Sequence, residues 1–444
     1  MERRIMHTLY RRKILYISAH LGGGAGKAIC GMALLQATEN DVSVLLLEKP
    51  DDIKYVDTLK NEKILVYVEE KDDIVKKLVV ESDVVIFNWW AHPLSIKFLY
   101  EYPEVKSRII IWNHVNGCTY PYLPFNFLDK FHAVAFTSRF SYENHLWTRS
   151  QKHDIWGKSA LILGMGKFNP EDIARKKDYS NGETFVVGYV GTVNYGKMSK
   201  QYIDYCKKAA EKIPNIKFII VGDPDKEVIS DIEKSGIADR FELTGKVNDV
   251  APYYRLFDVL GYLLNEDSYA TTENVLLEAM AFGLPIIVKN NNVEVRIIKD
   301  GVNGYVVSNE EEYADELHYL YTHPDIRREI GDKEYDYVSE YYSCIENYQR
   351  FEKLIDKVME QPEKNFDFKD ILGTAPYEWF MCFTGDDRKF FEQVISSPDN
   401  EHTNCKAIYK ERKKSSIRHF LDYFSDDVNL NLLCQKCVCR SGDE

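Results

Sequence analysis

The chain has 444 residues, of which 45% are hydrophobic and 13% aromatic, so it holds enough apolar material for two to four folded domains and is neither disordered nor collagen-like. Its 57 basic and 70 acidic residues give a net charge of −13, which argues against non-specific binding to nucleic acid through the overall field. The nine cysteines are scattered, as is typical of a reducing compartment. Because no apolar run approaches the roughly 18 residues of a membrane span, we expect a cytoplasmic protein.

Residues 1–13 form a basic leader in which arginines alternate with apolar side chains such as Ile5, Met6 and Leu9. This composition is compatible with two situations. The leader either stays solvated or contacts an anionic membrane surface, so the protein would be peripheral on the inner face of the membrane.

Residues 14–165 are predicted to form a first α/β domain. A β-rich run, a glycine-rich loop, a helical segment and a second β-rich run follow one another from Lys13 to Leu47. Continuous apolar runs that alternate with helices predict a parallel sheet covered on both faces. Further strands are expected at 64–68, 83–88, 108–113 and 133–138.

The same alternation restarts after a polar stretch, residues 166–183, which reads as a linker. A second α/β domain is therefore expected over 184–340, followed by an amphipathic crossover helix over 341–360 and an extension of unknown role over 361–444. In the second domain we expect strands at 185–191, 216–222, 240–245, 259–264, 285–288 and 304–307, and helices at 199–213, 226–235, 250–257, 273–282 and 310–321. The crossover helix is expected to bury Ile345, Tyr348, Phe351, Leu354 and Val358.

The glycine-rich loop Gly22–Lys27 lies between a predicted strand and a predicted helix, where backbone N–H groups favour an anion such as phosphate. It is not a P-loop, because Leu21 takes the place of the first glycine and Ala28 supplies no hydroxyl for magnesium. It fits the dinucleotide fingerprint poorly, because Lys27 stands where the third glycine belongs. A tight structural turn and a phosphate site both remain open.

The segment ENVLLEAMAFGLPIIV, residues 273–288, reads as a helix that Gly283 and Pro285 end before a buried strand. It resembles the signature of glycosyltransferase family 4, which comprises retaining enzymes that use nucleotide sugars and have the GT-B fold. Other pieces match in the family's order: GGGAGKA (22–28), GTVNYGK (191–197), FIIVGD (218–223), RFELTGKV (240–247) and DGVNGYVV (300–307).

The resemblance implies two Rossmann-like, doubly wound parallel-sheet domains that face a cleft, with the acceptor on the first and the nucleotide sugar on the second. It implies a polysaccharide-type hexosyltransferase that retains anomeric configuration and needs no metal and no cofactor. The co-substrate would be a UDP- or GDP-linked sugar. The acceptor would be a glycan, a lipid-linked molecule or another hydroxyl compound.

The resemblance also implies roles for particular residues. Glu278 would hold the donor ribose, Lys197 the leaving diphosphate, and His114 the donor sugar near the reaction centre. The weaker acceptor-side candidates are His92 and Lys27. The donor site would further include Gly23, Gly24, Thr192, Gly245, Lys246, Thr271, Thr272 and Glu273.

The sequence departs from the family pattern at two of these places. Ala270 stands where the family has the first Glu of its motif, and Glu273 cannot simply replace it, because it lies about 140° around the helix from Glu278. Thr192 replaces an arginine, a loss for which Lys27, Lys200 or Lys246 could compensate. A non-catalytic carbohydrate-binding or partner protein on a degenerate GT-B fold is therefore the alternative function.

Four cysteines lie near the end of the sequence, three of them in a compact run, Cys434-x2-Cys437-x-Cys439. This run supplies only three ligands, and His402 and Cys405 are distant in sequence. We therefore expect thiols rather than a zinc site.

Overall fold

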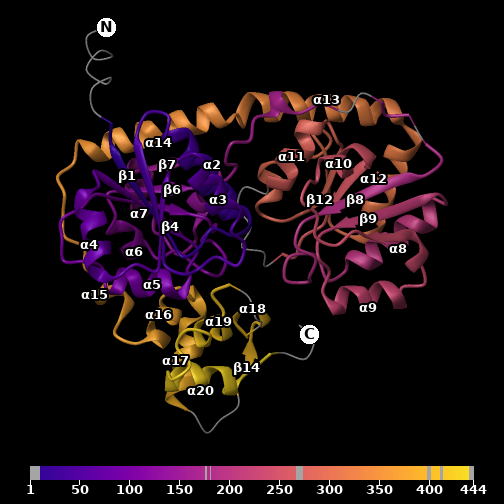
Figure 1. Ribbon diagram of the computed structural model, residues 1–444. Coiled ribbons are helices and arrows are strands. Elements are labelled where there is room, and N and C mark those ends of the chain that lie inside the picture. The colour runs from indigo at the N-terminus through magenta and orange to yellow at the C-terminus, as the bar shows by residue number, and fades with distance from the viewer. Residues whose placement is uncertain are drawn as a thin grey trace. The chain divides into compact units, whose positions relative to one another are not determined.

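The computed structural model describes residues 11–175, 178–180, 182–266, 274–397, 402–410 and 414–439. The chain divides into two compact units (Figure 1). The first comprises Met1–Lys167 with Cys344–Glu444, and the second Phe168–Ser343. The C-terminal extension is therefore part of the first unit. Within the described residues, every helix is too short or too polar to cross a membrane.

The first unit is built on a seven-stranded parallel sheet with the order β3-β2-β1-β4-β5-β6-β7. Its central strands are fully buried apolar runs, as predicted for a sheet covered on both faces. The strands are β1 (Lys13–Ser18), β2 (Asp41–Leu46), β3 (Leu65–Val68), β4 (Val84–Trp89), β5 (Ile109–Asn113), β6 (Ala133–Phe136) and β7 (Ser159–Leu161), and the helices α2 (Gly23–Gln36), α3 (Lys54–Asn61), α4 (Asp72–Glu81), α5 (Pro93–Tyr100), α6 (Phe125–Asp129) and α7 (Arg149–Gly157).

The second unit is built on a six-stranded parallel sheet with the order β10-β9-β8-β11-β12-β13. Two such sheets confirm the predicted α/β fold class. The strands are β8 (Phe185–Val190), β9 (Ile216–Val221), β10 (Phe241–Leu243), β11 (Val259–Tyr262), β12 (Ile286–Lys289) and β13 (Tyr305–Val307), and the helices α8 (Tyr202–Lys212), α9 (Lys226–Lys234), α10 (Ala251–Leu256), α11 (Asn274–Phe282), α12 (Glu310–Thr322) and α13 (Pro324–Tyr341).

Within the stretch 166–183, the described residues from Phe168 onward belong to the second unit. Tyr179 is buried, and its hydroxyl donates to the carbonyl of Gly283 over 2.6 Å. Gly283 follows α11 with a φ of +67°, and a Cβ there would stand 2.8 Å from the Tyr179 hydroxyl oxygen. The glycine therefore ends the helix and admits the tyrosine.

Helix α14 (Cys344–Met359) packs on the first unit through the apolar face that the sequence predicts. Phe351, Leu354 and Val358 are buried. Two of the five expected residues are not buried: Tyr348 is half-buried, and Ile345, at the start of the helix, is 58% exposed. The helix begins at Cys344 rather than at 341, because residue 341 ends α13.

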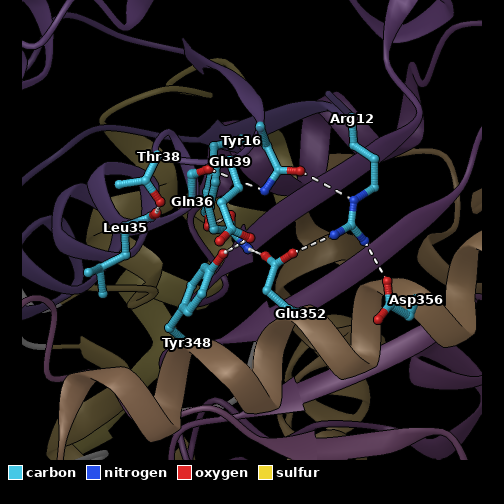
Figure 2. Close-up of polar contacts among 10 residues, drawn as sticks. Arg12, Tyr16, Leu35, Gln36, Thr38, Glu39, Tyr348, Glu352 and Asp356 are labelled. Carbon is cyan, nitrogen blue, oxygen red and sulfur yellow. Dashed lines mark hydrogen bonds and ion pairs between the residues drawn. The ribbon is translucent and has the colours of Figure 1, made fainter. Parts of the chain in front are cut away.

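A polar network ties the other side of α14 to β1 and α2, as Figure 2 shows. The guanidinium of Arg12 contacts Glu352 and Asp356, each over 2.7 Å. The amide of Gln36 donates to the second oxygen of Glu352 over 2.9 Å and accepts from Tyr16 over 2.6 Å. The Arg12 and Glu352 side chains are only 16% and 13% exposed, so this ion pair is largely shielded from water.

The extension after α14 is mostly helical and carries its own aromatic core. Phe380 contacts Phe391 and Phe420, and Phe383 lies 5.1 Å from the Trp89 ring of the first sheet. Elements α15 and α16 contact α5, beside which they lie in Figure 1. The elements are α15 (Lys369–Leu372), α16 (Pro376–Cys382), α17 (Arg388–Ser396), β14 (His402–Cys405), α18 (Ala407–Lys410), α19 (Ile417–Leu421), α20 (Val428–Lys436) and β15 (Cys437–Cys439).

Candidate functional site

Three glycines meet where the first strands of the second sheet end. Gly191 follows β8, Gly222 follows β9, and Gly245 lies just beyond β10. The Gly222 N–H donates to the Gly245 carbonyl over 3.2 Å, and a Cβ on Gly222 would stand only 2.0 Å from the carbonyl oxygen of Gly191. These loops therefore pack backbone against backbone at the carboxyl edge of the sheet, which is the usual ligand position in an open α/β sheet.

Lys197 lies in the loop that follows β8. Its N–H donates to the side chain of Asn194 over 3.1 Å, and its carbonyl accepts from the N–H of Asn265 over 2.9 Å. Its ammonium group lies 5.9 Å from the ring centroid of Tyr262, the last residue of β11. Lys197 is thus held at the carboxyl edge by its own backbone.

Two other predicted donor-site residues of the second unit are exposed. Thr192 lies in the same loop as Lys197, and its carbonyl accepts from the Tyr189 hydroxyl over 3.0 Å. Lys246 follows Gly245 and is also exposed. Ala270, Thr271, Thr272 and Glu273 lie outside the described residues.

Glu278 lies on α11 and is partly exposed. The hydroxyl of Tyr254, a fully buried residue of α10, donates to its Oε2 over 3.0 Å. Burial, followed by the charge of Glu278, raises the pKa of Tyr254 well above its ordinary value, so the phenol stays protonated. The carboxylate of Glu278 is therefore fixed in direction by a neutral donor.

His114 follows β5 at the carboxyl edge of the first sheet and lies 4.7 Å from the Trp112 ring. The side-chain nitrogen of Asn88 donates to the Ile17 carbonyl. The side-chain oxygen of Asn88 therefore accepts from Nε2 of His114, over 3.0 Å. Burial, and then the charge of Lys414, lower the pKa of His114 to about 3. His114 is therefore neutral, with its proton on Nε2 and a lone pair on Nδ1.

His92 is the N-cap residue of α5 at the same edge. Its Nδ1 accepts from the Leu94 N–H over 3.2 Å, so the donor nitrogen of the ring is Nε2, which lies 3.3 Å from Oε1 of Glu48. Glu48 and His20 were not predicted, because each follows its strand without a recognisable motif. Their positions could have indicated them, because His20 lies just after β1 and Glu48 just after β2.

The glycine-rich loop joins this cluster. A Cβ on Gly22 would stand 2.9 Å from Nδ1 of His20, and one on Gly26 would stand 2.7 Å from the backbone of Leu21. Gly23 has a φ of +55°, and neither it nor Gly24 has a neighbouring atom within 4 Å of the Cβ position. Gly22 and Gly26 are therefore needed for packing, while Gly23 and Gly24 leave open space where α2 begins, the helix that contains Lys27.

His20, Glu48 and His92 have the residue types of a metal site, with ligand atoms within 4.8 Å of one another. A metal ligand must offer a lone pair, however, and Nε2 of His92 carries its proton because Nδ1 accepts a backbone N–H. The arrangement is therefore better described as a hydrogen-bonded cluster than as a metal centre.

Comparison with known proteins finds one family model, glycosyl transferases group 1, over residues 170–337. Alpha-monoglucosyldiacylglycerol synthase of Acholeplasma laidlawii is 32% identical over 135 residues, which are 30% of this chain and 32% of that protein. The capsular polysaccharide biosynthesis glycosyltransferase CapM of Staphylococcus aureus is 22% identical over 219 residues, or 46% of this chain and 56% of that protein. The matched segments thus span between about a third and just over half of these relatives.

Among solved structures, HepE of Anabaena in complex with UDP-glucose resembles this chain with a TM-score of 0.63 at 15% identity. The likeness covers 78% of this chain and all of that one. It supports the GT-B fold. The second unit is, in addition, similar in sequence to glycosyl transferases group 1.

Proposed function

We propose that the protein is a glycosyltransferase that moves a hexose from a UDP-linked sugar to a hydroxyl group of a glycan or lipid-linked acceptor. The family match over residues 170–337 supports sugar transfer. The UDP-glucose complex of the similar HepE structure favours UDP over GDP as the nucleotide. Retention of anomeric configuration and independence from divalent metal follow from the resemblance to family 4.

The orientation of Glu278 is the observation that carries the proposal. The residue occupies the family's ribose-binding position, and Tyr254 fixes one of its oxygens. A carboxylate offers about four lone-pair directions, so the Glu278 type of side chain can accept from ribose hydroxyls as well as from a tyrosine hydroxyl.

Lys197 is assigned to the departing diphosphate, whose negative charge grows as the glycosidic bond breaks. When the acceptor attacks on the face from which the diphosphate leaves, a diphosphate oxygen takes the acceptor proton, so no carboxylate base is needed. Neutral His114 would accept from a sugar hydroxyl through Nδ1. It would add no charge beside the reacting carbon.

Glu278→Ala is expected to weaken binding of UDP-sugar by about 2 kcal/mol, the scale of hydrogen bonds to a charged group. Titration calorimetry with UDP on the full chain measures the loss. Glu233→Ala, which removes an exposed carboxylate of α9, serves as the matched control and should leave affinity unchanged. Equal affinity of wild type and a folded Glu278→Ala variant would remove Glu278 from the site.

A panel of UDP- and GDP-sugars separates this function from the alternative, a non-catalytic carbohydrate-binding protein. Thr192 and Ala270, which replace two family residues, motivate that alternative. We expect at least one UDP-sugar to raise the melting temperature and to release UDP on incubation. Binding without release of diphosphate, for every donor and acceptor tried, would favour the non-enzyme. Proton NMR of the product's anomeric signal then tests retention.

A further inference from the structure

Residues 414–423 of the extension are held against the carboxyl edge of the first sheet. Ser415 is buried there with a φ of +70°, and its hydroxyl donates to the Trp90 carbonyl over 3.0 Å. Its N–H donates to Nδ1 of His419 over 2.9 Å. Ala91, beside Trp90, also has a positive φ, +56°. Non-glycine residues persist in this strained region only where surrounding contacts determine them, so the attachment of the extension is specific.

The extension supplies two of the side chains that surround Glu48. The hydroxyl of Tyr423 donates to Oε2 of Glu48 over 2.5 Å and lies 3.4 Å from Nε2 of His92. The ring of His419 lies 4.7 Å from the ring of His92. A segment more than 300 residues away in sequence is therefore part of this cluster.

Glu48 is ionised and keeps hydrogen-bonding capacity. Burial alone would raise its pKa, but the hydrogen bonds from His92 and Tyr423 outweigh burial and lower it. A carboxylate has about four acceptor positions, and these two donors use two of them. The side chain of Glu48 is 20% exposed, so the remaining positions are reachable from solvent.

His20 faces the same carboxylate across a gap. Burial and the charge of Lys414 lower the pKa of His20 to about 4, so the ring is neutral near pH 7. Its Nε2 lies 3.9 Å from Oε1 of Glu48, too far for a direct hydrogen bond. A single hydroxyl oxygen placed between Nε2 of His20 and Oε1 of Glu48 would form a hydrogen bond with each of them, as bridging waters do. The Trp90 ring, 5.4 Å from His20, borders this position with a buried indole N–H that has no hydrogen-bond partner among the residues that the structure describes.

We propose that His20 and Glu48 form a subsite for hydroxyl groups of a neutral carbohydrate acceptor, with Tyr423 as the positioning residue that orients Glu48. The inference rests on the proposed function and specifies its acceptor. Hydroxyl groups both donate and accept, which suits a carboxylate beside a neutral imidazole. An anionic ligand would be repelled by Glu48. The nearby cation Lys414 lies over the Trp90 ring, 5.9 Å from its centroid.

The test uses the full chain and an array of immobilised mono- and oligosaccharides, followed by kinetics with the sugars that bind. Tyr423→Phe removes only the hydroxyl that holds Glu48, and we expect the KM for acceptor to rise about tenfold. Glu48→Gln should raise it further. The KM for donor should not change, because the donor does not use the acceptor subsite.

Tyr348→Phe is the matched control, because Tyr348 also donates to a glutamate, Glu39, over 3.0 Å in the same unit. It should leave the KM for acceptor unchanged. An unchanged acceptor KM in both Tyr423→Phe and Glu48→Gln would overturn the proposal, as would an equal rise in the KM for donor. Stoichiometric binding of Zn²⁺ that Glu48→Gln abolishes would identify a metal site instead.

The proposal can fail separately from the proposed function. If the wild-type chain neither hydrolyses a nucleotide sugar nor transfers from one to any acceptor, glycosyl transfer is wrong, yet glycan binding on the array that Glu48→Gln abolishes would still support the subsite. If the chain turns over a donor but binds no neutral glycan, the subsite assignment is wrong.

Discussion

Lys197→Ala should lower kcat by about two to three orders of magnitude, the cost of removing one preorganised group that stabilises charge in a transition state. The structure fixes the backbone of Lys197 on both sides, through Asn194 and Asn265. The loop that carries the ammonium group is therefore held in place by these two backbone contacts. Because the diphosphate gains charge only as the sugar leaves, the KM for donor should change much less than kcat.

Steady-state kinetics of UDP release measure this effect. Lys234→Ala, at the exposed end of α9, is the matched control and should keep wild-type turnover. Turnover of Lys197→Ala within about twofold of wild type is a change too small for a lost transition-state contact. It would show that another cation stabilises the departing diphosphate. Lys246→Ala then tests one of the other candidate cations.

Arg12→Ala should lower the free energy of unfolding of the first unit by about 3 kcal/mol, because it leaves a shielded carboxylate without its counter-charge. Figure 2 shows the partners that would be lost, Glu352 and Asp356 on α14. Urea unfolding followed by tryptophan fluorescence reports this unit alone, because all six tryptophans belong to it: Trp89, Trp90, Trp112, Trp147, Trp156 and Trp379.

The neighbouring Arg11→Ala is the matched control. Its ion pair with Asp41 is half exposed, so its loss should cost little. A second change, Glu352→Gln in the Arg12→Ala background, should restore most of the stability by removing the unpaired charge. Equal effects of Arg11→Ala and Arg12→Ala would show that the network of Figure 2 does not hold α14 in place.

The stability of the Arg12→Ala variant should depend on pH in a direction set by the pKa of Glu352. Burial raises the pKa of Glu352 even with Arg12 present, and Arg12 opposes that rise. Without Arg12 the folded state binds a proton more readily than the unfolded state. Stability should therefore fall as the pH rises through the raised pKa, and the deficit should shrink in acid.

Most of the fold could be predicted from the sequence because its central strands are continuous apolar runs. Strand β7 was missed because its three residues are only half buried at the edge of the sheet. Helix α13 was missed because its buried face includes Arg327 and Glu334 among few apolar side chains. Burial of charged groups in this way breaks the apolar periodicity on which the prediction rests.

The candidate site was predictable where it depends on local motifs. Lys197, Glu278 and His114 each follow a strand or lie on a helix that the sequence indicates. The contact between Glu48 and Tyr423 could not be predicted from the sequence, because 375 residues separate them and no local pattern links the extension to the first sheet. The contact arises only when the chain returns through α14 to the first unit.

The transfer reaction itself tests the proposed function most directly. The full chain is incubated with a UDP-sugar radiolabelled in the sugar, a neutral glycan acceptor and excess EDTA, and label in the glycan is counted against released UDP. We predict equal amounts of the two, unaffected by EDTA and lowered at least a hundredfold in Lys197→Ala, the scale of a lost transition-state contact. No label in any glycan and no release of UDP from any donor would contradict glycosyl transfer.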